Sequence, residues 1–89
     1  MSTAARRHAE PRIRNVRVTD VAIIVDLHDG RSVSVPLWWS WRLEQATPDQ
    51  RQRFEILDEG ESVRWPDIDE DLSARGFLEG SPAPRQRKL

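Results

Sequence analysis

Three tryptophans within four residues, Trp38-Trp39-Ser40-Trp41, restrict the fold of this chain more than any other feature. Neighbouring residues in a helix point about 100° apart, so three indoles so close in sequence cannot all enter one small core. We expect Trp39 to cover an apolar sheet face, which leaves Trp38 or Trp41 at least partly exposed beside Arg42. Exposed aromatic rings near an arginine are typical of protein-interaction hot spots. The alternative is that all three indoles pack, one of them against a second hairpin or in a dimer contact.

The size of the chain indicates a single small domain. A chain of 89 residues buries only about 60–65% of its unfolded surface, and only 37% of these residues are hydrophobic. Four tryptophans offset part of this lean composition, because each buries roughly 150–250 Å². We predict one domain over residues 12–79, between flexible basic tails at residues 1–11 and 80–89.

The sequence contains no cysteine, which excludes disulfides, thiolate catalysis and zinc sites with cysteine ligands. Its longest apolar run, Val21–Val25, is too short to span a bilayer. The first residues lack the apolar core of a signal peptide. We therefore expect a cytoplasmic protein.

The first half of the predicted domain reads as a three-stranded antiparallel sheet. Strands are predicted over Asn15–Val18 and Ala22–Leu27, followed by the hairpin signal Asp29-Gly30. A two-residue loop would pair apolar with polar residues, whereas the loop His28–Gly30 sets Val25 opposite Val33 and Ile23 opposite Val35. The register therefore favours the three-residue loop, with Gly30 in the left-handed conformation.

The second half adds short helices and a second hairpin. Leu37–Ala46 is predicted to be helical from about Trp39, and Thr47, Pro48 and Gln50 form the start signal of another short helix. Two strands are expected on either side of the turn Asp58–Gly60, and Ser73 begins a last helix that stops at Gly80. The predicted order is βββααββα, an α+β domain.

The acidic segment Asp67-Ile68-Asp69-Glu70-Asp71 follows Trp65-Pro66 and is expected to face outward. A calcium-binding loop does not fit, since Leu72 stands where such a loop needs glycine and Leu78 where it needs a closing carboxylate. A pair of catalytic carboxylates, as in glycoside hydrolysis, lacks an accompanying sugar-binding platform. Two interpretations stay open: a solvated structural loop, or an acidic patch that binds a partner.

The charge is distributed unevenly along a chain whose net charge is only −1. Residues 1–17 hold five arginines against one glutamate, and residues 85–89 are basic again, whereas residues 55–71 are strongly acidic. Such a field can orient a charged partner. Arginine-rich tails are also compatible with a nucleic-acid-binding accessory or regulatory protein, although no helix-turn-helix pattern is present and the acidic middle repels phosphate.

Signals for catalysis are weak throughout. His8 and His28 have no neighbouring serine, aspartate or cysteine in a triad-like pattern, and no glycine-rich phosphate loop is present. We predict a protein that is not an enzyme and has no cofactor or metal ion.

Several motifs resemble the domain of unknown function 2442, a family of small bacterial proteins. They are Asp29-Gly30-Arg31, Val33–Leu37, Trp39, Arg42-Leu43, Ala46-Thr47-Pro48, Gln50-Arg51, Trp65–Ser73 and Gly76. The resemblance covers roughly residues 12–79. It implies a small stand-alone protein that is often encoded beside another small protein, and hence a paired, toxin–antitoxin-like role. Arg64 stands where many members have histidine, and Leu57-Asp58 where glycine is common, so the second turn is expected to differ in shape.

Together these observations predict a protein-interaction module, with the nucleic-acid-binding protein as the alternative. The partner is expected to be a protein encoded by the adjacent gene, and a homodimer is also compatible with the sequence. The predicted partner-binding residues are Trp38, Trp41, Arg42, Arg64, Trp65, Asp67, Asp69, Glu70 and Asp71.

Overall fold

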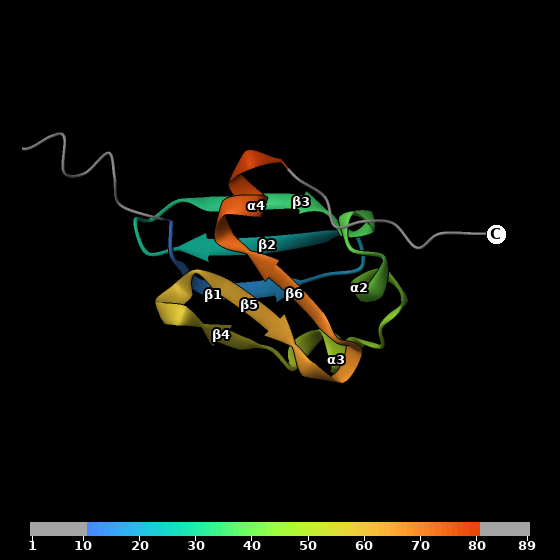
Figure 1. Ribbon diagram of the computed structural model, residues 1–89. Coiled ribbons are helices and arrows are strands. Elements are labelled where there is room, and N and C mark those ends of the chain that lie inside the picture. The colour runs from blue at the N-terminus through green and yellow to red at the C-terminus, as the bar shows by residue number, and fades with distance from the viewer. Residues whose placement is uncertain (1–10, 81–89) are drawn as a thin grey trace, which may run out of the picture.

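The computed structural model describes residues 11–80 (Figure 1). The predicted tails, residues 1–11 and 80–89, fall outside this range apart from Pro11 and Gly80. His8 and most of the terminal arginines lie outside it as well. The described part contains six strands and three short α-helices. The strands are β1 (Ile13–Val18), β2 (Ala22–Leu27), β3 (Ser32–Pro36), β4 (Glu55–Leu57), β5 (Ser62–Trp65) and β6 (Glu70–Ser73). The α-helices are α2 (Trp41–Gln45), α3 (Pro48–Gln52) and α4 (Ala74–Glu79), and single 3-10 turns are η1 (Leu37–Trp39), η2 (Asp58–Gly60) and η3 (Pro66–Ile68).

The first sheet has the strand order β1-β2-β3, antiparallel throughout. Val25 lies opposite Val33 and Ile23 opposite Val35, as the alternation predicted. Leu27 N–H donates to the carbonyl of Arg31, which closes a three-residue loop, and Gly30 has φ 95°. The predicted hairpin is therefore confirmed. A positive φ at this position explains the glycine, since other residues reach it only with strain.

The second sheet has the order β4-β5-β6 and contains one strand more than predicted. The hairpin β4–β5 is confirmed, with Ile56 opposite Val63. Strand β6 runs through the acidic segment and pairs Leu72 with Val63. The acidic residues had suggested a solvated loop, but alternation places Asp71 on the outer face and Leu72 on the inner face. The predicted α+β class and element order hold, with β6 added before the last helix.

The turn between β4 and β5 has an unusual backbone. Asp58, Glu59 and Gly60 all have positive φ, at 53°, 57° and 97°. Glycine reaches a positive φ without strain, whereas Asp58 and Glu59 adopt it here as residues that carry a Cβ. Gly60 is buried against β1, where an added Cβ would lie 2.9 Å from the backbone nitrogen and oxygen of Ile13. This close approach fixes the second hairpin against the first sheet.

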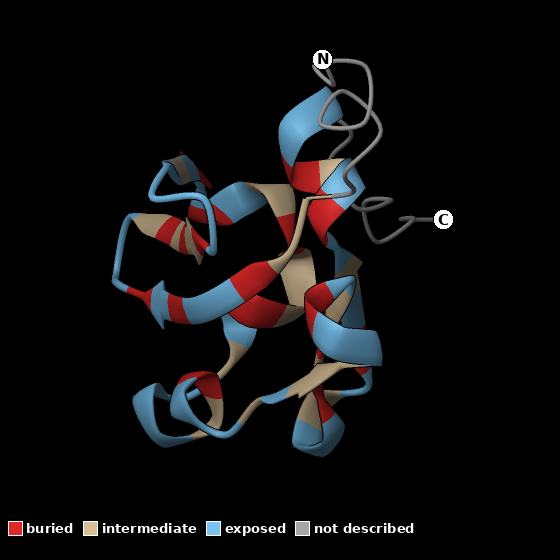
Figure 2. Cartoon of the chain, turned by 90° about the vertical axis from the view of Figure 1, so that its left-hand side faces the viewer, coloured by how far each residue is buried: buried red, intermediate tan, exposed pale blue. Residues whose placement is uncertain are grey.

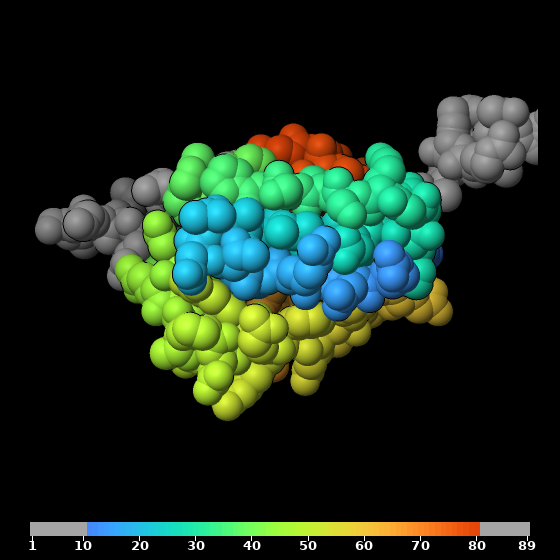
Figure 3. Space-filling model, turned by 180° about the vertical axis from the view of Figure 1, so that it is seen from behind, coloured from blue at the N-terminus to red at the C-terminus, as the bar shows by residue number. Residues whose placement is uncertain are grey.

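The core lies between the two sheets. In Figure 1 the sheet β4–β5–β6 lies in front of β1–β2–β3, and the view from behind shows the outer face of the first sheet (Figure 3). Buried residues alternate with partly buried ones along β2 and β5 (Figure 2). The core draws on both sheets and on α2 and α4: Ile13, Val16, Ile23, Val25, Leu27, Leu43, Val63, Trp65, Ala74 and Phe77.

The helices begin where side chains can cap them. Thr47 and Gln50 form the predicted capping box of α3, with bonds of 2.9 and 3.1 Å. Ser73 caps α4, which ends at Gly80 with φ 80°. The helix expected from Trp39 begins two residues later, at Trp41, because Ser40 is extended and caps α2. Trp39 is partly buried against the core, as predicted.

Candidate interaction surface

The tryptophan cluster packs Trp39 partly on the core and leaves Trp38 exposed, which agrees with the prediction that Trp38 or Trp41 would be at least partly exposed. Trp39 packs on the core, while Trp38 is 47% exposed and contacts Trp39 edge to face, with ring centroids 6.4 Å apart. Trp41 is half-buried, and the guanidinium of Arg42 lies 4.6 Å from its ring centroid. This is the distance of a cation–π contact. We call Trp38, Trp41 and Arg42 the tryptophan surface.

Arg42 is held in place by a buried carboxylate. Its Nη1 lies 3.8 Å from Oε1 of Glu70, whose side chain is 5% exposed. The same Oε1 accepts a bond of 2.9 Å from the backbone N–H of Asp71, and Oε2 accepts the hydroxyl of Ser40. Ser40 Oγ in turn accepts from Leu43 N–H at 3.1 Å. Glu70 thus joins the start of α2 to strand β6 and orients Arg42 beside Trp41.

Two predicted contact residues are therefore wrong as direct partner contacts. Glu70 is 4% exposed and Trp65 is 0% exposed, so neither can touch a partner in this fold. Alternation along β5 and β6 turns both side chains inward, where Trp65 lies opposite Glu70. The Trp65 indole N–H donates to the carbonyl of Arg51 at 3.0 Å. Both residues instead hold neighbouring elements of the fold in place as buried residues.

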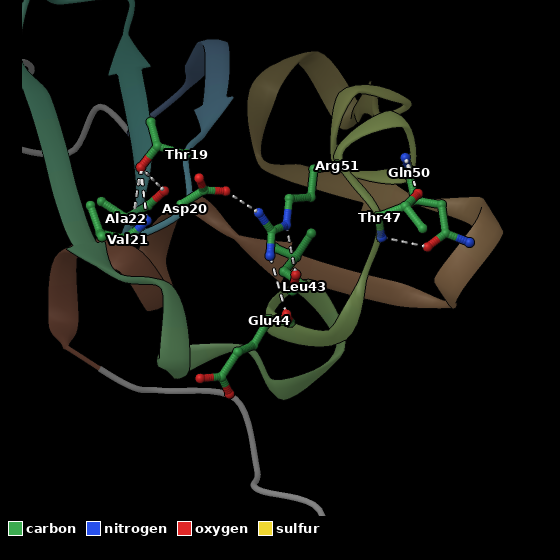
Figure 4. A network of polar contacts seen from close by, with 9 residues as sticks. All are labelled: Thr19, Asp20, Val21, Ala22, Leu43, Glu44, Thr47, Gln50 and Arg51. Carbon is green, nitrogen blue, oxygen red and sulfur yellow. Dashed lines mark hydrogen bonds and ion pairs between the residues drawn. The ribbon is translucent and has the colours of Figure 1, made fainter.

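Arg51, which belongs to one of the family-like motifs, is buried, and its contacts were not predicted from the sequence (Figure 4). Its guanidinium donates to the carbonyls of Leu43 and Glu44, at 3.0 and 3.1 Å, and to Asp20 Oδ1 at 3.1 Å. It thereby adds a second donor to the Leu43 carbonyl, which already accepts from Ala46 N–H at 3.2 Å, and gives the Glu44 carbonyl near the end of α2 a donor. Through Asp20 it also fixes α2 to the β1–β2 turn. Ser40 was missed too, although a serine before a helical pattern is an ordinary cap signal.

The exposed aspartates of the acidic segment face outward, as expected. We call Asp67, Asp69 and Asp71 the carboxylate rim. Asp69 and Asp71 flank the buried Glu70 in sequence, and alternation along β6 turns Asp71 to the face opposite Glu70.

Arginines neutralise part of the carboxylate rim. Arg53 lies 3.1 Å from Asp67, and Arg64 lies 3.0 Å from Asp69 and 3.9 Å from Asp71. Arg64 is the cross-strand neighbour of Asp71. The rim is therefore a mixed pattern of charges rather than a uniformly negative patch. Such patterns favour specificity over simple attraction.

Two further features of residues 11–80 are their possible metal ligands and their net charge. Within residues 11–80, no group of three or more histidine, aspartate or glutamate side chains is placed to hold a metal ion. His28 lies exposed on the β2–β3 loop. These residues include nine arginines and fourteen acidic side chains, a net charge of −5. Of the terminal arginines that suggested nucleic-acid binding, Arg12, Arg14 and Arg17 lie within this range and the others lie outside it.

The fold and the surface define a small α+β domain with a supported tryptophan surface and a charged rim. The family model described as "Protein of unknown function (DUF2442)" matches residues 13–83, and the chain belongs to this family. The match confirms the resemblance seen in the sequence motifs.

Two solved structures share the fold. A protein of unknown function from Rhodospirillum rubrum is 33% identical, with a TM-score of 0.74, and the match covers 86% of this chain and 95% of that one. The uncharacterized protein CV0863 from Chromobacterium violaceum is 25% identical, with a TM-score of 0.71, over 91% of this chain and 74% of that one. No curated protein matches the sequence. In residues 11–80, every helix is too short and too polar to cross a membrane.

Proposed function

We propose that this chain is a non-enzymatic protein-interaction module of the bacterial cytoplasm that binds its partner through the tryptophan surface and the carboxylate rim. The observation that carries the proposal is Trp38, 47% exposed beside a cation–π pair whose arginine is fixed by a buried carboxylate. Tryptophan and arginine dominate interface hot spots because they bury much area from a defined geometry. A surface that is already ordered loses less entropy on binding.

The proposal gives each part of the surface a role. Trp38 supplies apolar area, Trp41 and Arg42 form a rigid polar–aromatic contact, and Asp67, Asp69 and Asp71 select a partner with cationic groups at matching positions. Arg64 takes part by holding two of these aspartates, at 3.0 and 3.9 Å. Glu70 and Trp65 act only as supports.

The gene arrangement implied by the family resemblance supports a narrower form of the proposal. In that form the partner is the small protein encoded by the adjacent gene, and this chain neutralises it as an antitoxin does. A neutralising partner must bind tightly and selectively, which an ordered aromatic surface with a patterned charged rim supports.

Co-purification of the adjacent gene product with the tagged chain tests the proposal. The variant Asp69→Lys with Asp71→Lys reverses the charge at two of the three rim positions and should reduce capture by about tenfold or more, because like charges then meet across the interface. The matched control is Asp49→Lys with Glu61→Lys, which makes the same change of charge at two exposed acidic residues outside the rim. Circular dichroism should show that both variants stay folded. Equal capture by the wild type and both variants would show that the carboxylate rim has no part in binding the partner.

A further inference from the structure

A second exposed apolar group lies at the end of the first sheet, next to Trp38. Among residues 11–80, only three large hydrophobic side chains are exposed, and two of them, Val21 at 76% and Trp38 at 47%, lie here. The N–H of Leu37, the residue before Trp38, donates to the Val21 carbonyl at 2.9 Å. Exposed Pro36 lies opposite Ala22 in the β2–β3 register. We call Val21, Pro36 and Trp38 the Val21 patch.

The Val21 side chain is held outward by a defined turn. Thr19 Oγ1 accepts from the backbone N–H groups of Val21 and Ala22, at 3.1 and 3.0 Å. Thr19 N–H also donates to the Ala22 carbonyl at 2.9 Å. Tight turns favour small or polar residues, and an exposed valine contributes nothing to this one. The turn thus presents an apolar side chain in a fixed position without a structural need for it.

Acidic side chains border the Val21 patch. Asp20 precedes Val21, and its side chain remains 94% exposed although one oxygen accepts from Arg51. The same guanidinium donates to the carbonyl of Glu44, which brings Glu44 to this end of the molecule. Figure 4 shows the Asp20 carboxylate directed toward the Arg51 guanidinium and Glu44 below it, with the Glu44 carboxylate directed away from Arg51. Glu44 makes no ion pair with any residue of the described range.

The geometry points to a docking site for a protein segment that combines apolar and basic side chains. The apolar residues would cover Val21, Pro36 and Trp38, and lysine or arginine would pair with Asp20 and Glu44. The net charge of −5 over residues 11–80 favours a cationic segment over an anionic one. This inference rests on the proposed function, because it names the chemistry of the partner that the tryptophan surface binds, and it extends the contact area from Trp38 to the β1–β2 turn.

Nuclear magnetic resonance on the full chain tests this site directly. The probe is a short peptide of alternating leucine and arginine, and the matched peptides replace arginine by glutamate or leucine by glycine. The leucine–arginine peptide should shift the Trp38 indole N–H and the Val21 amide signals and leave the buried Trp65 indole signal unchanged. Shifts confined to other regions, or equal shifts with the leucine–glutamate peptide, would overturn the inference.

Three variants separate this site from its alternatives. Val21→Ser and Glu44→Lys should each weaken peptide binding by about fivefold or more, since one removes apolar area and the other repels a cation. Glu61→Lys makes the same charge change outside the patch and should leave the affinity unchanged. Concentration-dependent self-association that Val21→Ser abolishes would assign the patch to a second copy of the chain and contradict the inference.

Failure of the inference and failure of the proposed function are distinguishable. In one case, binding of the adjacent gene product is weakened by Asp69→Lys with Asp71→Lys but is unchanged by Val21→Ser and by Glu44→Lys. The proposed interaction module is then supported, and the docking site at the Val21 patch is wrong. In the other case, the peptide binds the Val21 patch, but no partner loses affinity for the variant Asp69→Lys with Asp71→Lys. The proposed role of the carboxylate rim is then wrong, and the docking site is supported.

Discussion

The hydroxyl of Ser40 donates a hydrogen bond to the buried carboxylate of Glu70 while it accepts one from the backbone N–H of Leu43. One small side chain thus caps α2 and ties that helix to strand β6. Because Glu70 also positions Arg42 beside Trp41, the tryptophan surface depends on this bond.

Ser40→Ala should lower the free energy of unfolding by about 1–3 kcal/mol, because it removes a helix cap and leaves a buried carboxylate with one partner fewer. Ser34→Ala, on the exposed face of β3, is the control and should change stability by less than about 0.5 kcal/mol. Urea unfolding measures both. Equal, small effects would show that the Ser40–Glu70 bond contributes little to the fold.

Arg51→Met should destabilise the fold by about 2–4 kcal/mol, since three acceptors lose a charged donor at a largely buried site. Arg53→Met makes the same substitution at an exposed arginine, whose only ion pair within residues 11–80 is with Asp67, and should cost less than about 1 kcal/mol. Thermal or urea unfolding of the two variants provides the comparison. A larger loss at Arg53 would contradict the role given to Arg51.

Gly60→Ala and Gly30→Ala form a matched pair, because both glycines have positive φ, at 97° and 95°. An added Cβ at Gly30 meets nothing within 4 Å, so only backbone strain of about 1–2 kcal/mol is expected there. At Gly60 it meets the Ile13 backbone at 2.9 Å, so the loss of unfolding free energy should be clearly larger. Similar losses would argue against the close contact between the second hairpin and β1.

Asp26 should titrate below its ordinary pKa of 3.8, because the Ser32 hydroxyl and then Arg17 donate to its carboxylate. Its pKa is lower in the folded than in the unfolded state, so its contribution to stability is present above the unfolded value. That contribution is lost as the pH falls through the folded pKa. Carbon-detected carboxyl titrations should show the pKa of Asp26 rising in Ser32→Ala. An unchanged pKa would exclude the Ser32 hydroxyl as its cause.

Much of the fold follows from local patterns in the sequence. The β2–β3 register was predictable because only one loop length matches apolar with apolar residues, and the α3 cap because Thr47, Pro48 and Gln50 satisfy one local geometry. Strand β6 was not predictable in this way, since a buried glutamate among aspartates looks the same in sequence as an exposed one. Burial of Glu70 and Arg51 depends on partners far along the chain, Ser40 for the one and Asp20 for the other.

The exposed part of the site followed from geometry that the sequence contains. Adjacent indoles must diverge, so a packed Trp39 and an exposed indole at Trp38 or Trp41 were predictable, but only the structure shows that Trp38 is the more exposed of the two. The pairing of the carboxylate rim with Arg53 and Arg64 was not, because it needs β4–β6 in place. The separation into contacting and supporting residues likewise required the structure.

The most direct test of the account is the affinity of the captured partner for Trp38→Ala, measured by calorimetric titration against the wild type. The account predicts a loss of about tenfold or more, the effect of truncating a central hot-spot residue. Leu78→Ala, another exposed apolar residue, serves as the control and should bind normally. Unchanged affinity of a folded Trp38→Ala variant would contradict the account, because the tryptophan surface would then have no part in binding.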